Sequence, residues 1–167
     1  QIQGISYGQR EVTDNLAVQF TSPPTHGLFS IGILHCNVGG ISGHDNYAPC
    51  TVDDLNNVGI DYWALGHIHT RETLREEKPS IVYPGNTQGR NPRETGARGC
   101  ILVTVDSDGS VHKEFKELDV VRWESIEVPI DGMNGIDDLH DEISVQLDRL
   151  RTEAKGRQVV CRVALTG

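Results

Sequence analysis

The sequence lacks several features that would place it in a familiar class. Its four cysteines are widely spread and form no C-x-x-C pair, so neither a zinc knuckle nor a disulfide framework is indicated. No apolar run approaches the roughly 20 residues of a membrane span, and no signal-peptide pattern is present. We therefore expect a protein of the reducing cytoplasm with no membrane-spanning segment.

Basic residues are also scarce. The chain of 167 residues has a net charge of −9, with 9 basic and 14 acidic residues in 1–117 and 6 and 10 in 118–167. Lys and Arg contacts to phosphates carry non-specific DNA binding, so any contact with DNA must be local or supplied by residues outside this chain. Methionine occurs once, and the chain opens at Gln1. We expect it to be a piece of a larger protein.

What is present is a pair of buried-strand patterns that each end in histidine. The segment LFSIGILHCNVGG is apolar up to His35, and IDYWALGHIH is apolar up to His67 and His69. A helix start lies between them, with Thr51 as its N-cap. Strand, short helix and strand in this order indicate a parallel pair in a layered α/β fold. Functional groups gather at the carboxyl ends of such strands, which is where all three histidines stand.

The spacing of these histidines suggests a metal site. In an extended strand alternate side chains point the same way, about 6.5 Å apart, so His67 and His69 could reach one metal ion or two neighbouring ions. Imidazole suits zinc, iron, manganese and nickel, and a pair of metal ions can split phosphate esters. Gly66 and neighbouring glycines leave space for a substrate phosphate. We therefore expect His35, His67 and His69 to bind metal.

The rest of the chain predicts a hairpin and a second domain. Residues 100–118 alternate about the turn D-S-D-G, which is typical of a β-hairpin. Strand, helix and strand patterns follow, and Gly156 is a natural C-cap for the helix. We expect two domains, residues 1–118 and residues 119–167, the second being a small β-α-β unit.

Three stretches carry a resemblance to a known family. ILHCNVGG, YAPCTVDDLNNVGIDYWALGHIH and YPGNTQGRNPRETGARGC resemble the later part of calcineurin-like metallophosphoesterases, closest to the SbcD and YhaO type of DNA-repair exonuclease. The final β-α-β unit is similar to the capping domain that follows the nuclease domain there. The resemblance implies an α/β fold, namely part of a metallophosphoesterase layered β-sandwich with flanking helices, followed by a truncated cap.

The same resemblance implies a function. Two divalent metal ions would be bound, with manganese as the usual activating metal: His35 and His67 would hold one ion and His69 the other. DNA ends are the implied substrate, and an SbcC-type ATPase is the typical partner. The family motifs D-x-H, G-D and G-N-H-D are not found in context, so the remaining ligands and the catalytic general acid are expected upstream. We expect this chain to carry about half of a metal site and to be inactive alone.

Further candidates concern substrate binding. Arg90 and Arg93 belong to the only local positive excess and could contact phosphate, and His44 lies in a glycine-rich loop beside the predicted site. Each could equally be an ordinary solvated loop residue. Two other functions stay open: a non-catalytic DNA- or protein-binding domain, and a phosphoesterase acting on nucleotides or other small molecules. A truncated sheet would also expose an edge through which a homodimer could form.

Overall fold

The computed structural model describes residues 1–23, 27–40 and 45–167. Contacts divide the chain into two compact units. Unit 1 comprises residues 1–86 and 101–114, and unit 2 comprises residues 87–100 and 115–167. This division does not test the domain boundary expected near residue 119, which stays a prediction.

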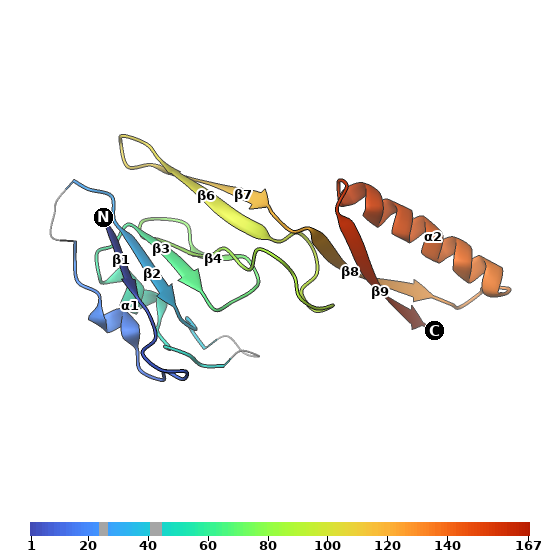
Figure 1. Ribbon diagram of the computed structural model, residues 1–167, viewed down its shortest axis with the longest axis horizontal. Coiled ribbons are helices and arrows are strands. Elements are labelled where there is room, and N and C mark those ends of the chain that lie inside the picture. Colours follow the sequence, from blue (N-terminus) through green and yellow to red (C-terminus); the bar gives the residue numbers. More distant parts are fainter. Residues whose placement is uncertain (24–26, 41–44) are drawn as a thin grey trace. The chain divides into compact units, whose positions relative to one another are not determined.

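Unit 1 is built on a five-stranded mixed sheet (Figure 1). Its strands are β1 (Ile2–Ile5), β2 (Ile31–His35), β3 (Tyr62–Gly66), β4 (Glu72–Arg75) and β5 (Ser80–Tyr83). They lie in the order β1-β2-β3-β5-β4, with β4 antiparallel to β5 and every other pair parallel. The expected parallel pair, β2 and β3, is confirmed. The two edge strands, β1 and β4, were not expected.

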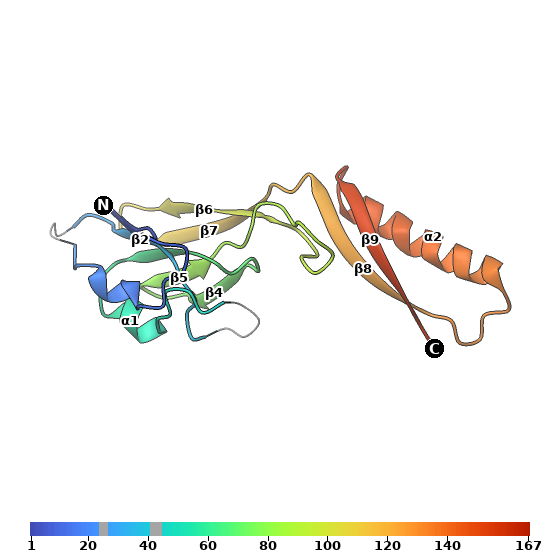
Figure 2. The ribbon, with the colours of Figure 1, turned by 60° about the horizontal axis from the view of Figure 1, so that its bottom comes forward.

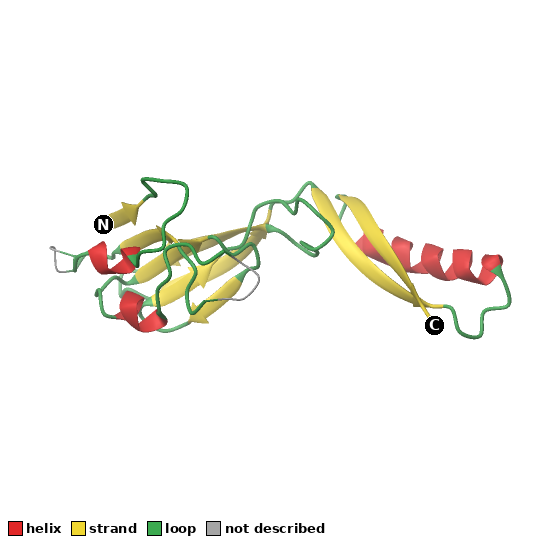
Figure 3. Ribbon diagram, turned by 90° about the horizontal axis from the view of Figure 1, so that it is seen from below, coloured by secondary structure: helices red, strands yellow, loops and turns green. Residues whose placement is uncertain are grey.

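Two short helices accompany this sheet, and Figure 3 shows both in red. They are the 3-10 helix η1 (Leu16–Gln19) and α1 (Val52–Asn56). Thr51 caps α1 as expected: its hydroxyl accepts the backbone N–H of Asp54 at 3.1 Å, and the Asp54 carboxylate accepts the N–H of Thr51 at 2.8 Å. This reciprocal pair is a capping box, which satisfies two donors that the helix start would otherwise leave unpaired.

Trp63 of β3 organises the core of unit 1. Its side chain is fully buried, its indole N–H donates to the carbonyl of Leu55 in α1 at 3.1 Å, and its ring meets Phe20 edge to face at 4.8 Å. A Cβ atom on Gly32 of β2 would lie 2.5 Å from the indole ring. Only glycine therefore fits at this point of β2, and the close packing fixes how β2 and β3 lie side by side.

Unit 2 contains the expected β-α-β element. It consists of β8 (Val121–Pro129), α2 (Ile136–Glu153) and β9 (Gln158–Thr166). β8 and β9 pair in parallel, and Figure 2 shows α2 lying along them. The buried core between helix and sheet is Ile126, Val128 and Leu150. No helix in the described part of the chain, α2 included, is long and apolar enough to cross a membrane.

The expected β-hairpin is present, and its central residues, 101–114, belong to unit 1. Its strands are β6 (Gly99–Val105) and β7 (Val111–Glu117), and the N–H of Gly109 closes the turn on the carbonyl of Asp106 at 2.9 Å. His112 is exposed, with its Nε2 atom 2.9 Å from the Asp106 carboxylate. The structure is thus a mixed α/β protein with few helices, and the sandwich layering that the resemblance implies stays a prediction.

A buried ion network fixes the start of β8. The guanidinium of Arg122 donates to Asp119 from Nε and Nη2, each at 2.9 Å, and to Glu117 at 2.8 Å. The Asp119 side chain is fully buried. Burial alone would raise the pKa of Asp119, but the hydrogen bonds from Arg122 and from the backbone N–H of Arg98 outweigh it and hold the pKa below its usual value.

Candidate metal centre

His35 and His67 meet at the carboxyl ends of two neighbouring parallel strands. His35 is the last residue of β2 and pairs with Gly66, the last residue of β3, so that His67 follows directly. The two imidazole centroids are 5.2 Å apart and the ring planes cross at 69°. Metal–nitrogen bonds measure about 2.0 to 2.1 Å for zinc, so rings this close can face a common ligand.

Gly66 makes room for this arrangement. A Cβ atom on Gly66 would lie 2.9 Å from Nδ1 of His35 and 3.5 Å from its Cγ. The space that the sequence analysis assigned to a substrate phosphate is, at this glycine, taken by the His35 imidazole. Any side chain at position 66 would therefore displace the His35 ring.

His67 lies just past the end of the extended strand. β3 ends at Gly66, and the φ of His67 is +102°, a region that residues with a side chain adopt at a cost. Ile68 belongs to the core of unit 1, with 5% of its surface exposed. Nε2 of His67 is 2.8 Å from the carbonyl oxygen of Asp45. Because a carbonyl only accepts, this nitrogen carries a hydrogen, and in the neutral ring Nδ1 holds the lone pair.

The surroundings of His35 lower the pKa of its ring and so favour the uncharged form. Burial lowers its pKa, and the neighbouring His67 and His69 lower it further because like charges would repel. Neutral imidazole is the form that ligates a metal ion. His69 is thus close enough to act on His35 electrostatically.

These donors fit a divalent metal ion in kind but do not form a complete site. Among the described residues, no group of three or more His, Cys, Asp or Glu side chains is arranged to hold a metal ion. Metal binding by His35, His67 and His69 therefore stays a prediction, and it requires donors beyond those that the structure describes.

Two tyrosines that the sequence analysis missed flank the histidine pair. The Tyr7 ring lies edge-on to His35 with centroids 5.5 Å apart, and its hydroxyl donates to the His35 carbonyl at 2.6 Å. Tyr47 lies edge-on to His67 at 5.6 Å. Burial raises the pKa of Tyr7 to about 12, so the hydroxyl stays protonated and donates at neutral pH. No local motif marks either residue, because each reaches the site only through the fold.

A third tyrosine fixes the backbone that follows His35. The buried hydroxyl of Tyr83 donates to the carbonyl of Cys36 at 2.8 Å and accepts the N–H of Val38 at 3.0 Å. Two backbone groups that leave the strand ladder are satisfied in this way. The end of β2, and with it His35, is held by a side chain from β5.

Two comparisons with known proteins bear on the kind of protein to which this chain belongs. Residues 123–167 match the family described as "Metallophosphoesterase YhaO, middle domain". Over 166 residues, 99% of this chain, the sequence is 40% identical to a Bacillus subtilis (strain 168) protein named "Uncharacterized metallophosphoesterase YhaO". The two matches support a metallophosphoesterase. Enzymes of that kind are hydrolases that use divalent metal ions.

The two matches differ in extent. The middle-domain match falls within unit 2 and does not include the three histidines, whereas the match to the Bacillus subtilis relative extends over 99% of the chain. This chain spans 40% of the length of that relative. What the whole protein does is therefore a matter for proposal.

The structure describes two of the three candidate substrate-binding residues. Arg90 and Arg93 are exposed and lie on a loop that groups with unit 2. His44 lies outside the described residues. Contact of any of the three with a substrate stays a prediction.

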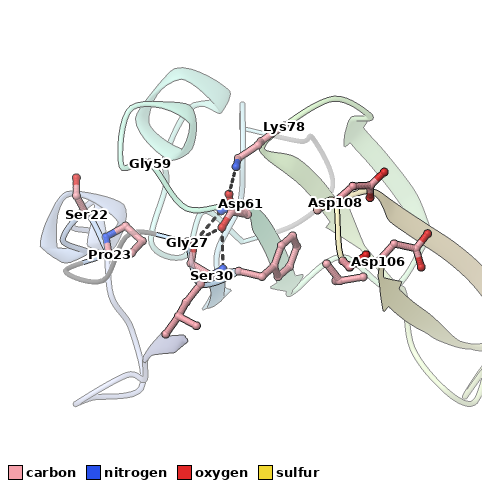
Figure 4. Close-up of a pocket in the computed structure, with 14 residues that line it drawn as sticks. Ser22, Pro23, Gly27, Ser30, Gly59, Asp61, Lys78, Asp106 and Asp108 are labelled. Carbon is pink, nitrogen blue, oxygen red and sulfur yellow. Dashed lines mark hydrogen bonds and ion pairs between the residues drawn. The ribbon is translucent and has the colours of Figure 1, made fainter.

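A polar hollow of about 470 Å³ lies in unit 1 at the opposite ends of β2 and β3 (Figure 4). There the Asp61 carboxylate accepts the backbone N–H and the hydroxyl of Ser30, each at 2.7 Å, and forms an ion pair with Lys78. Burial would raise the pKa of Asp61, but these partners lower it overall. Because the partners satisfy this carboxylate, we interpret it as a tie between the starts of the two strands.

Proposed function

We propose that this chain is part of a dinuclear-metal phosphodiesterase that acts as a DNA repair exonuclease. One observation carries the proposal: His35 and His67 are in ring contact at the carboxyl ends of adjacent parallel strands, in a chain 40% identical to a protein named as a metallophosphoesterase. Functional groups at that edge of a parallel sheet are the usual arrangement in layered α/β enzymes.

The chain's own contribution is to present imidazole nitrogens. His35 and His67 would hold one divalent ion and His69 the other, with manganese as the metal that the family resemblance implies. Bound metal ions of this kind polarise a phosphodiester and lower the pKa of an attacking water. Partial burial and the neighbouring imidazoles lower the pKa of His35, which favours the neutral ring, and the hydrogen bond to the Asp45 carbonyl orients the ring of His67. The general acid and the remaining ligands would come from residues outside this chain.

The substrate and partners follow from the same resemblance. We propose DNA ends as the substrate, an SbcC-type ATPase as the partner and the cytoplasm as the location, with homodimerisation through an exposed sheet edge as a further expectation. The net charge of −9 supports a local contact with DNA, at Arg90 and Arg93, over an extensive one.

The test uses the full-length protein that contains this chain, with end-labelled DNA and Mn²⁺. His35→Ala, His67→Ala and His69→Ala should each lower turnover by at least about 100-fold, because losing even a supporting group of a metal site costs 10- to 100-fold. His112→Ala is the matched control, since this histidine is exposed on β7, and it should leave turnover unchanged. Full activity in the His35 variant, or robust turnover by the 167 residues alone, would contradict the proposal.

The same assay separates the alternatives. A full-length protein that hydrolyses nucleotides or bis-p-nitrophenyl phosphate with Mn²⁺ but leaves DNA intact would be a small-molecule phosphoesterase. A protein that binds DNA with no turnover under any divalent metal would be a binding domain.

A further inference from the structure

Residues 87–98, which we call the arginine loop, form a charged element in unit 2. The loop holds Arg90, Arg93 and Arg98 against one acidic residue, Glu94, in a chain whose net charge is −9. Arginine presents a planar fork of donors that matches a phosphate group in a bidentate manner. If an acidic chain contacts phosphate at one local site, a loop with excess positive charge is where we expect that contact.

The side chain of Gln88 ties the beginning of the loop to β8. Its Oε1 atom accepts the N–H groups of Val120 and Val121 at 2.9 and 3.3 Å. Its Nε2 atom donates to the carbonyls of Gly89 and Val121 at 2.9 and 2.7 Å. One amide thus makes four hydrogen bonds, which bind the loop to the point where β8 starts.

Trp123 of β8 holds the loop at two further points. Its indole N–H donates to the carbonyl of Gly89 at 3.0 Å, and its own carbonyl accepts the N–H of Gly96 at 2.9 Å. A Cβ atom on Gly89 would lie 2.7 Å from the carbonyl oxygen of Glu94 and 3.0 Å from Cδ1 of Trp123. The loop therefore packs closely against the indole, and Trp123 bonds to it at both Gly89 and Gly96.

Bonds within the loop fix the backbone at each exposed arginine. The N–H of Arg90 donates to the Glu94 carboxylate at 2.7 Å, and the N–H of Arg93 donates to the side-chain oxygen of Asn91 at 3.0 Å. A group that is already ordered before binding loses less conformational entropy when it binds. These hydrogen bonds restrain the backbone at Arg90 and Arg93 before any ligand binds.

We propose that Gln88 and Trp123 are positioning residues that present Arg90 and Arg93 to the phosphodiester backbone of a nucleic-acid strand. This deepens the proposed function and rests on it for the class of substrate. Neither positioning residue needs to touch the nucleic acid, and each acts by holding the loop that carries the arginines.

Binding is measured with the whole chain, a fluorescent single-stranded DNA of 20 nucleotides, and EDTA to remove metal ions. Arg90→Gln with Arg93→Gln should weaken binding about tenfold and reduce the slope of log affinity against log salt by about 1.4, since each lost phosphate contact on a single strand accounts for about 0.7. The control is Arg149→Gln with Arg151→Gln, which removes the same charge from exposed positions of α2. It should change affinity less than about twofold.

A double-mutant cycle then tests the positioning role. Trp123→Phe removes the indole donor and should weaken binding about threefold in the wild-type background, but by less than about 1.5-fold when both arginines are already replaced, because coupled residues are not additive. A merely structural effect of Trp123 would persist in both backgrounds. Gln88→Met is run in parallel, so that the cycle still decides the matter if the tryptophan variant does not fold.

Three results would overturn the inference. The first is that the wild-type chain binds no DNA, and the second is that the arginine variant binds DNA as tightly as its control. The third is that Trp123→Phe and Gln88→Met weaken DNA binding as much in the arginine variant as in the wild-type background. Because EDTA is present, failure of the metal proposal would leave the cycle unchanged. Failure of the cycle would leave metal-dependent hydrolysis by the full-length protein intact.

Discussion

Replacing Gly66 with alanine should separate the histidine site from the stability of the fold. The new Cβ atom would lie 2.9 Å from Nδ1 of His35, whereas ordinary contacts between such atoms begin at about 3.4 Å, so the ring must move by about 0.5 Å or more. Loss of a group that orients a metal ligand costs about 10- to 100-fold in affinity, or about 1.4 to 2.7 kcal/mol, and we expect displacement of the His35 ring to cost a similar amount. Isothermal titration of Mn²⁺ into the full-length protein measures this loss.

The same substitution should leave folding almost unchanged. The crowded atom belongs to a side chain that can rotate, and alanine loses less backbone entropy on folding than glycine, so we expect the free energy of unfolding in urea to shift by less than about 1 kcal/mol. Gly4→Ala is the control in the same sheet, since its Cβ would make only an ordinary contact of 3.7 Å with Ile33. Unaltered Mn²⁺ affinity in the Gly66 variant would refute a ligand role for the His35 ring in its observed position.

Substitutions at three further positions test the packing that supports the two units. Arg122→Met should cost about 3 kcal/mol at pH 7 by leaving the buried Asp119 carboxylate without its main partner. The pKa of Asp119 is depressed in the folded state, so its contribution to stability is present above the unfolded pKa near 3.9 and fades as the pH falls. Urea unfolding should therefore show that Arg122→Met costs less stability at pH 3 than at pH 7. An equal cost at both pH values would count against the network. Tyr83→Phe should cost about 2 kcal/mol in the same assay, because two buried backbone groups lose their partner. Thr51→Ala should cost about 1 kcal/mol and Thr51→Ser almost nothing, since only the serine variant keeps the capping oxygen.

The elements that the sequence predicted are those with a strong local pattern. β2 and β3 are continuous apolar runs, α1 has a capping residue, and the apolar residues of α2 recur at helical spacing with Gly156 after the helix end. β1 was missed because its four residues contain a glycine and only one face is half-buried, so its pairing with β2 depends on tertiary contacts. The grouping of residues 87–100 with unit 2 rests on hydrogen bonds between segments more than 30 residues apart, which no local pattern encodes.

The candidate site was predictable in its residues but not in its geometry. The convergence of His35 and His67 follows from the rule that parallel strands end at the same sheet edge. Their relative orientation does not, because it depends on the end of β3 at Gly66 and on rings contributed by Tyr7 and Tyr47. These tyrosines lie in irregular segments, where side-chain direction cannot be read from sequence spacing.

The backbone at His67 gives a way to measure what the site costs the fold. At φ +102° a residue with a Cβ atom is strained by about 1 to 3 kcal/mol, and glycine is not. His67→Gly and His67→Ala both lose the hydrogen bond to Asp45, so that loss cancels when they are compared. We expect the glycine variant to be more stable than the alanine variant by about 1 kcal/mol in urea unfolding, the reverse of their usual order within a strand. Equal stability of the two variants would show that the backbone at position 67 is unstrained. The expected order would show that the fold keeps a strained histidine where glycine fits better. Such a conflict with local backbone preference is typical of functional positions.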